Sequence, residues 1–190
     1  MNKFISQILI GLFAAAVTKG QGFIYDQQSA DENHYMEGGV GLGQQPLGQS
    51  FTPSLSAIGF IRTYLFGGSS GTFIINLRSN SITGPILASS DPVSLTATGP
   101  VNFFFANPIA VTANSTYYFQ PLIQNAVGGW GVFAAQYNYA NGTAFVDGFA
   151  VPNSDFWFRE GIVVPEPQSW ALLLVGFGLF FYARLRSLKM

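Results

Sequence analysis

The chain has 190 residues, of which 48% are hydrophobic, 16% aromatic and only 9% charged, and it contains no cysteine. This length suits one domain with a sizeable core. The missing cysteines exclude disulfide-bonded scaffolds and thiolate metal sites, and the scarcity of charge excludes acidic disordered tails, long coiled coils and basic nucleic-acid-binding proteins.

Charge is unevenly distributed along the chain. Two lysines lie within the first 19 residues, and three basic residues lie within the last seven. The segment 23–167 carries three arginines and all nine carboxylates, a formal net charge of −6. A segment of this charge repels phosphate backbones and anionic lipid head groups, so we expect no nucleic-acid partner.

The first 22 residues are predicted to form a secretory signal peptide. Lys3 supplies a positive charge, residues 4–17 form an apolar stretch, and the small residues Gly20 and Gly22 follow. Cleavage after Gly22 would make Phe23 the new N-terminus. The alternative is an amphipathic first helix, but the stretch lacks the polar face and the N-cap of such a helix.

Residues 23–163 are predicted to form an all-β domain, because short β-rich runs alternate with Gly, Pro, Asn and Ser and no window has a helical period. Along 72–78, Phe73, Ile75 and Leu77 share one face, which is the pattern of a half-buried strand. The run 67–71, Gly-Gly-Ser-Ser-Gly, is interpreted as a hairpin turn. The predicted strands cover 23–26, 48–51, 57–65, 72–78, 85–89, 101–105, 116–122, 130–137, 143–146 and 156–162.

This spacing of strands predicts an antiparallel β-sandwich of jelly-roll type, with an up-and-down barrel as the alternative. Three segments, GQSFTP at 48–53, GTFIINLRSN at 71–80 and DFWFR at 155–159, resemble the choice-of-anchor β-sandwich modules of bacterial surface proteins. The resemblance implies a sandwich fold and an exported protein, and it transfers no binding residues.

Catalytic residues are not expected in this domain. His34 is the only histidine, so a three-histidine zinc site is impossible, and no serine lies in a nucleophile elbow. We therefore predict no enzyme activity and no cofactor. A glycosidase that uses two carboxylates is the remaining catalytic alternative.

Acidic residues near the start of the domain are weak candidates for a calcium site, because calcium prefers oxygen ligands. A solvated acidic face is the alternative interpretation. Asp147 and Asp155 could approach these residues from the far end of the domain. The candidates are Asp26, Asp31, Glu32 and Glu37.

Four aromatic residues are candidates for glycan contacts, because an exposed flat ring can stack on the apolar face of a sugar. Packing in the core is the alternative for each of them. The four are Trp130, Tyr137, Tyr139 and Trp157, with Asn138, Asn141 and Asp147 as polar neighbours.

The last segment, 164–190, is predicted to contain one transmembrane helix. Between Glu166 and Arg184 lie 17 uncharged residues, about 26 Å as a helix, against a hydrocarbon core of about 30 Å. Trp170 and Tyr182 would lie at the two membrane interfaces, and the basic residues Arg184 and Arg186 predict a cytoplasmic C-terminus.

The tripeptide Pro165, Glu166 and Pro167 precedes this span, and its prolines favour an extended backbone. Together with Trp170-Ala-Leu-Leu-Leu, Gly176, Gly178 and the terminal arginines, it resembles the PEP-CTERM protein-sorting domain. The resemblance implies export, transient anchoring in the inner membrane, recognition of the tripeptide by an exosortase-type membrane protease, and delivery to the cell surface or an exopolysaccharide matrix.

The sequence thus predicts three parts: a signal peptide at 1–22, a β-sandwich at 23–163 and a sorting and anchor segment at 164–190. The predicted function is that of a non-enzymatic protein of the cell surface or extracellular matrix. The alternative is a carbohydrate-binding module that acts on exopolysaccharide.

Overall fold

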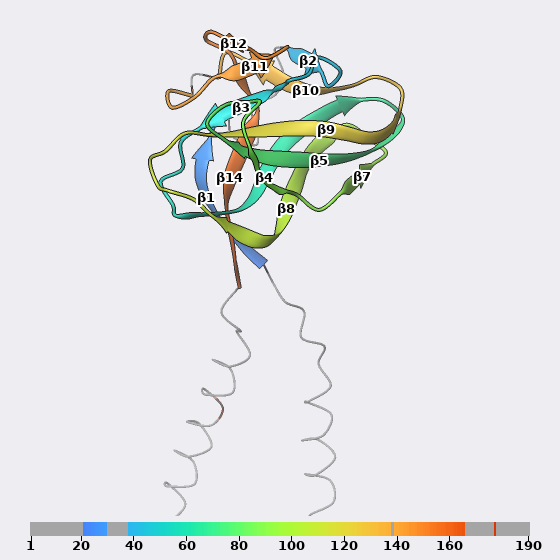
Figure 1. Ribbon diagram of the computed structural model, residues 1–190. Coiled ribbons are helices and arrows are strands. Elements are labelled where there is room, and N and C mark those ends of the chain that lie inside the picture. Colours follow the sequence, from blue (N-terminus) through green and yellow to red (C-terminus); the bar gives the residue numbers. More distant parts are fainter. Residues whose placement is uncertain (1–20, 30–37, 138, 166–176, 178–190) are drawn as a thin grey trace, which may run out of the picture. The chain divides into compact units, whose positions relative to one another are not determined.

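The computed structural model describes residues 21–29, 38–137, 139–165 and 177. In these residues the chain forms two antiparallel β-sheets that pack face to face as a sandwich (Figure 1). Phe23–Val163 make up one compact unit, and the terminal segments 1–22 and 164–190 are grouped apart from it. The described residues contain no helix with the length and apolar character needed to cross a membrane. The expected signal peptide and anchor lie almost entirely outside the described residues.

The first sheet has seven strands in the described residues, in the order β1-β14-β4-β10-β13, with β8 paired to β4 and β2 paired to β10. Strand β4 is central, because it pairs with β14, β10 and β8. Its pairing with β8 covers almost its whole length. The strands are β1 (Gln21–Gln28), β2 (Gly39–Gly41), β4 (Ala57–Gly67), β8 (Gly99–Ala110), β10 (Trp130–Ala135), β13 (Asp155–Phe156) and β14 (Phe158–Pro165).

The second sheet also has seven strands in the described part of the chain, in the order β12-β11-β3-β9-β5-β6, with β7 paired to β5. Its longest pairing joins β5 to β9, from Ser70 opposite Val127 to Ser79 opposite Tyr117. The strands are β3 (Gly48–Phe51), β5 (Ser70–Ser79), β6 (Ile86–Ser89), β7 (Val93–Leu95), β9 (Tyr117–Val127), β11 (Ala144–Val146) and β12 (Phe149–Val151).

All ten predicted strands are present, which confirms the all-β prediction. Three short strands, β2, β7 and β12, were not predicted from the sequence, because three residues carry too little alternation to be distinguished from a loop. The predicted strand 156–162 is interrupted at Trp157, which separates β13 from β14.

The prediction of a hairpin at 67–71 is wrong. Gly67 ends β4 in the first sheet and Ser70 begins β5 in the second, so the connection crosses from one sheet to the other. Gly67 and Gly68 have φ angles of 103° and 45°, a left-handed backbone that glycine adopts without steric cost. The Gly-Gly pair therefore lets the chain leave one sheet and enter the other within a few residues.

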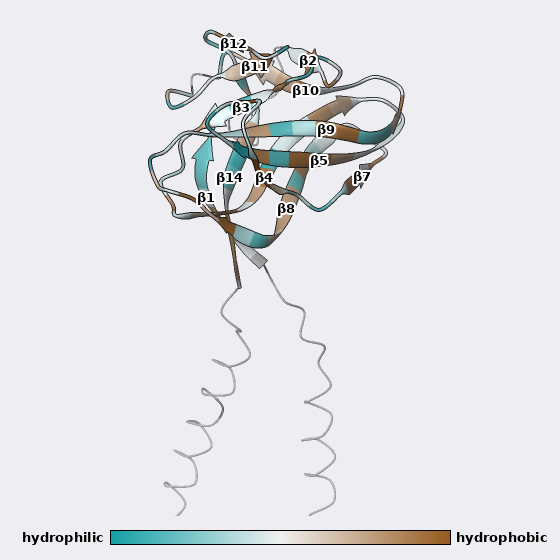
Figure 2. Ribbon diagram, viewed as in Figure 1, coloured by the Kyte–Doolittle hydropathy of each residue, from teal (hydrophilic) through white to brown (hydrophobic). Residues whose placement is uncertain are grey.

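The core lies between the two sheets, and Figure 2 shows that β5 and β9 each carry both hydrophobic and hydrophilic residues. Phe73, Ile75 and Leu77 of β5 are fully buried, as predicted. At one end of the core, Phe119 of the second sheet lies 5.3 Å from Phe158 of the first, measured between ring centroids. At the other end, Phe73 and Trp130 join the sheets in the same way at 4.9 Å.

The first and last strands of the sandwich are neighbours at one edge of the first sheet. The backbone N–H of Ser29, just after β1, donates to the carbonyl of Phe158 at the start of β14. Gly161 in the middle of β14 lies directly against Ile24 near the start of β1. The two strands are therefore antiparallel, and β1 begins where β14 ends (Figure 1).

Candidate functional site

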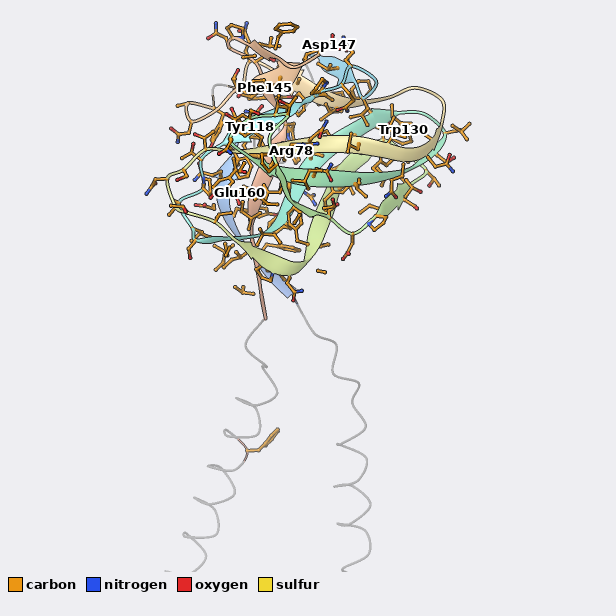
Figure 3. All side chains as sticks on the ribbon, in the orientation of Figure 1. Arg78, Tyr118, Trp130, Phe145, Asp147 and Glu160 are labelled. Carbon is orange, nitrogen blue, oxygen red and sulfur yellow. The ribbon has the colours of Figure 1, made fainter. Side chains whose placement is uncertain are left out.

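Glu160 is a fully buried acidic residue on β14, with 0% of its surface exposed (Figure 3). Side chains alternate between the two faces of a strand, and Phe158 packs in the core, so Glu160 also points inward. Its partner in the register is Ile61 of β4, another fully buried core residue. The sequence thus places a carboxyl group at a position that the strand pattern reserves for an apolar side chain.

Neither carboxyl oxygen of Glu160 has a hydrogen-bond partner. The Asp26 carboxylate and the backbone N–H of Gln27 lie beside this carboxyl group, but neither forms a hydrogen bond of ordinary geometry with it. Burial raises the pKa of Glu160 to about 9, and the negative charge of Asp26 adds to the effect. Glu160 is therefore protonated at neutral pH.

Asp26 of β1 is held in the opposite state. Its Oδ2 accepts the backbone N–H groups of Ser54 at 2.6 Å and of Leu55 at 3.0 Å, and its Oδ1 accepts the Ser54 hydroxyl. Partial burial raises the pKa of Asp26, but these hydrogen bonds outweigh it and hold the pKa below its ordinary value. The loop between β3 and β4 thus stabilises an ionised Asp26 beside a protonated Glu160. We call these two residues the acid pair.

A network of hydrogen bonds connects the acid pair to both sheets. The Tyr139 hydroxyl donates to Gln27 Oε1 at 3.0 Å, next to Asp26 in the chain. The backbone N–H of Tyr139 donates to Asp155 Oδ2 at 2.9 Å, and the amide of the buried Gln49 donates to Asp155 Oδ1 at 2.9 Å. Gln49 belongs to the second sheet and Asp155 to the first, so the network links the two layers.

The pKa values in this network follow from burial and from the concentration of negative charge. Burial raises the pKa of Tyr139 to about 12, and the charges of Glu160, Asp26 and Asp155 act in the same direction. Burial also raises the pKa of Asp155, although its hydrogen bonds from Gln49 and Tyr139 offset part of the effect. Burial and the nearby carboxylates thus keep the Tyr139 hydroxyl protonated.

The acid pair has the two protonation states that general acid–base catalysis requires. Catalysis also requires contact with a substrate, and Glu160 is fully buried. A groove of about 170 Å³ lies elsewhere, between β5, β7 and the end of β9. It is lined by uncharged residues, among them Thr72, Ser94 and Asn125, and none of the acid pair contributes to it.

The four aromatic glycan candidates do not lie together on one exposed surface. Trp130 is in the core between the sheets and is 4% exposed. Trp157 is 1% exposed and packs with Phe133, Tyr64 and Tyr137 in a separate cluster. Neither indole presents a free face on which a sugar could stack. Tyr139 is half-buried against Phe158. The packing of these aromatic residues does not favour glycan contact, which stays a prediction from the sequence.

The predicted calcium candidates are only partly described. Asp26 belongs to the acid pair, while Asp31, Glu32 and Glu37 lie outside the described residues. Among the described side chains, no group of three or more His, Asp or Glu is arranged to hold a metal ion. Asp147, with φ of 51°, occupies the turn between β11 and β12, and Asp155 joins the Tyr139 network.

The sorting tripeptide begins at Pro165, the last residue of β14. The remaining sorting and anchor residues lie outside the described part of the chain. They are Glu166, Pro167, Trp170, Gly176, Gly178, Tyr182, Arg184 and Arg186.

Comparison with known protein families finds no family model that matches this chain, and comparison with curated proteins finds no match. The family resemblances carried by residues 48–159 and 164–186 therefore stay predictions from the sequence.

Proposed function

We propose that this chain is an exported, non-enzymatic protein of the cell surface or extracellular matrix, sorted through Pro165, Glu166 and Pro167. In this proposal an exosortase-type membrane protease recognises the tripeptide. A signal peptide at 1–22 starts export, and a helix within 164–190 holds the precursor in the inner membrane. The β-sandwich between them, of jelly-roll type, is the part that is delivered.

One observation carries this proposal: the last strand of the sandwich ends at Pro165, where the tripeptide begins. A cut at or after the tripeptide would leave all the described strands intact. The first and last strands of the sandwich, β1 and β14, are adjacent in one sheet, and the β11–β12 hairpin lies at the opposite end of the sandwich (Figure 1).

Replacement of Glu166 tests the proposal. Glu166→Ala removes the carboxylate of the tripeptide, so we expect the precursor to accumulate uncleaved in the inner membrane of the producing cell. Gln168→Ala, two residues further along, is the matched control and should be processed like the natural chain. Immunoblots of membrane and secreted fractions measure both. Unchanged release of the Glu166→Ala protein would falsify the proposed sorting.

A further inference from the structure

We propose that the outer face of the second sheet binds an acidic polysaccharide, in which Arg78 holds the carboxylate of a uronic acid residue and Tyr118 stacks on its sugar ring. The proposal rests on the proposed function for its choice of a polysaccharide, since a protein of an extracellular matrix meets one. The binding residues are separate from the acid pair and from the four aromatic glycan candidates.

The strand register shows which side chains of this sheet face away from the core. Leu77 of β5 and Phe119 of β9 are paired, and both are fully buried in the core. Arg78 and Tyr118 are the next pair in the register, and they point to the opposite face because side chains alternate along a strand. Both are partly exposed. Paired residues on one face have Cβ atoms about 5 Å apart, so a single ligand can contact both.

Arg78 is the only charged residue in the described strands of the second sheet. Its Nε donates to Gln120 Oε1 at 2.8 Å, and its Nη1 donates to the carbonyl of Gly84 at 2.6 Å. These two bonds fix the guanidinium plane and use two of its five N–H donors. Neither acceptor is a carboxylate. Arg78 is therefore a fixed cation with donors left for a carboxylate, which arginine binds through two parallel hydrogen bonds.

Tyr118 supplies a flat ring beside this guanidinium. It contacts Phe145 of β11 edge to face, with the ring centroids 5.6 Å apart, so its plane is held in position. On the other side of Arg78, its register partner Ile86 is 51% exposed and extends the face with apolar surface. Figure 3 labels Arg78, Tyr118 and Phe145 on three strands of this sheet. The face thus combines one cation with rings on which a sugar can stack.

A uronic acid residue matches this combination. Its carboxylate is attached directly to the sugar ring, so one residue can reach the guanidinium and the Tyr118 ring together. The net negative charge of the sandwich does not oppose such contact at this face, because the carboxylates within described strands all belong to the first sheet. They are Asp26, Asp155 and Glu160.

Calorimetric titration of the full chain in nonionic micelles with tetragalacturonate tests the proposal. At neutral pH we use about 0.15 M NaCl, which screens charges more than about 8 Å away, and expect one oligosaccharide to bind. Its methyl ester has the same rings without the charge, and should bind at least about tenfold more weakly. A tetraglutamate peptide has the charge without the sugar rings, and should bind at least about fivefold more weakly.

Three variants locate the contact. Arg78→Met removes the cation but keeps an unbranched side chain, so we expect at least a tenfold loss of affinity for tetragalacturonate and no change for the methyl ester. Tyr118→Leu removes the ring and should weaken binding about fivefold. Thr72→Ala, on the same face near the other end of β5, is the matched control and should bind as the natural chain does.

Several results would overturn the proposal: no binding of tetragalacturonate at concentrations up to about 5 mM, equal binding of the acid and its methyl ester, tetraglutamate binding as tightly as the sugar, or unchanged binding by Arg78→Met. If Arg78→Met failed to fold, the comparison of acid and ester on the natural chain would decide. The titration uses purified protein, whereas the release of Glu166→Ala is measured in cells, so failure of one proposal is distinguishable from failure of the other.

Discussion

At the scale of single residues, Glu160 departs furthest from what its strand requires. The run Phe156 to Ile162 was predicted as a strand, and Phe156 and Phe158 do face the core. The same alternation places Glu160 inward, so its burial could have been read from the sequence. Its proximity to Asp26 could not, because that contact depends on β1 pairing with β14 across more than a hundred residues.

The raised pKa of Glu160 predicts that the stability of the sandwich depends on pH. The folded state keeps a proton up to about pH 9, whereas the unfolded chain releases it near the ordinary pKa of 4.5. The free energy of unfolding should therefore fall by about 1.4 kcal/mol per pH unit as the pH rises within this window. Glu160→Gln should remove this slope and unfold with roughly 4 kcal/mol more free energy at pH 8.

Urea denaturation of both proteins in micelles at pH 5 and pH 8, followed by tryptophan fluorescence, measures this effect. The two proteins should differ little at pH 5, where Glu160 is protonated in the folded state. Parallel pH profiles for the natural chain and Glu160→Gln would contradict the predicted protonation of Glu160.

At the scale of elements, the connection at 67–71 shows that a local sequence pattern predicts a turn but not which strands the turn connects. Glycines and serines between two apolar runs predict a turn, and a turn is present. Whether that turn closes a hairpin or crosses between sheets depends on the pairing of β4 with β8 and of β5 with β9. These pairings join residues far apart in the sequence, so local turn chemistry does not reveal them.

Gly68 makes the crossing possible, and we predict that Gly68→Ala is strongly destabilising. The φ angle of Gly68 is 45°, and a Cβ there would lie 1.8 Å from Trp130 Nε1. That indole is 4% exposed and donates to the carbonyl of Ser70, so it has little room to move. We expect a loss of about 3 kcal/mol in the free energy of unfolding.

Urea denaturation again measures the loss, with Ser69→Ala as the matched control. Ser69 is exposed and adjacent, so its replacement should change the free energy of unfolding by less than about 0.5 kcal/mol. Equal midpoints for Gly68→Ala and Ser69→Ala would show that the connection tolerates a side chain at this position.

At the scale of the whole molecule, composition and strand spacing were sufficient to predict an all-β sandwich between two apolar terminal segments. The order of strands within each sheet could not be predicted from the sequence, because each sheet joins strands from both halves of the chain. One such long-range pairing has a functional consequence. The β1 strand lies against β14, so the residues that follow the predicted signal peptide stabilise the strand that precedes the sorting tripeptide.

This pairing limits where export can cut the chain, and we predict a secreted product that begins at or before Phe23 and ends at or after Pro165. The Phe23 ring lies 5.1 Å from that of Phe60, which is fully buried. Removal of β1 would uncover Phe60 and detach Asp26 from the β3–β4 loop. Intact-mass spectrometry of the secreted fraction locates both ends. A folded product that begins after Asp26 would mean that the sandwich does not need its first strand.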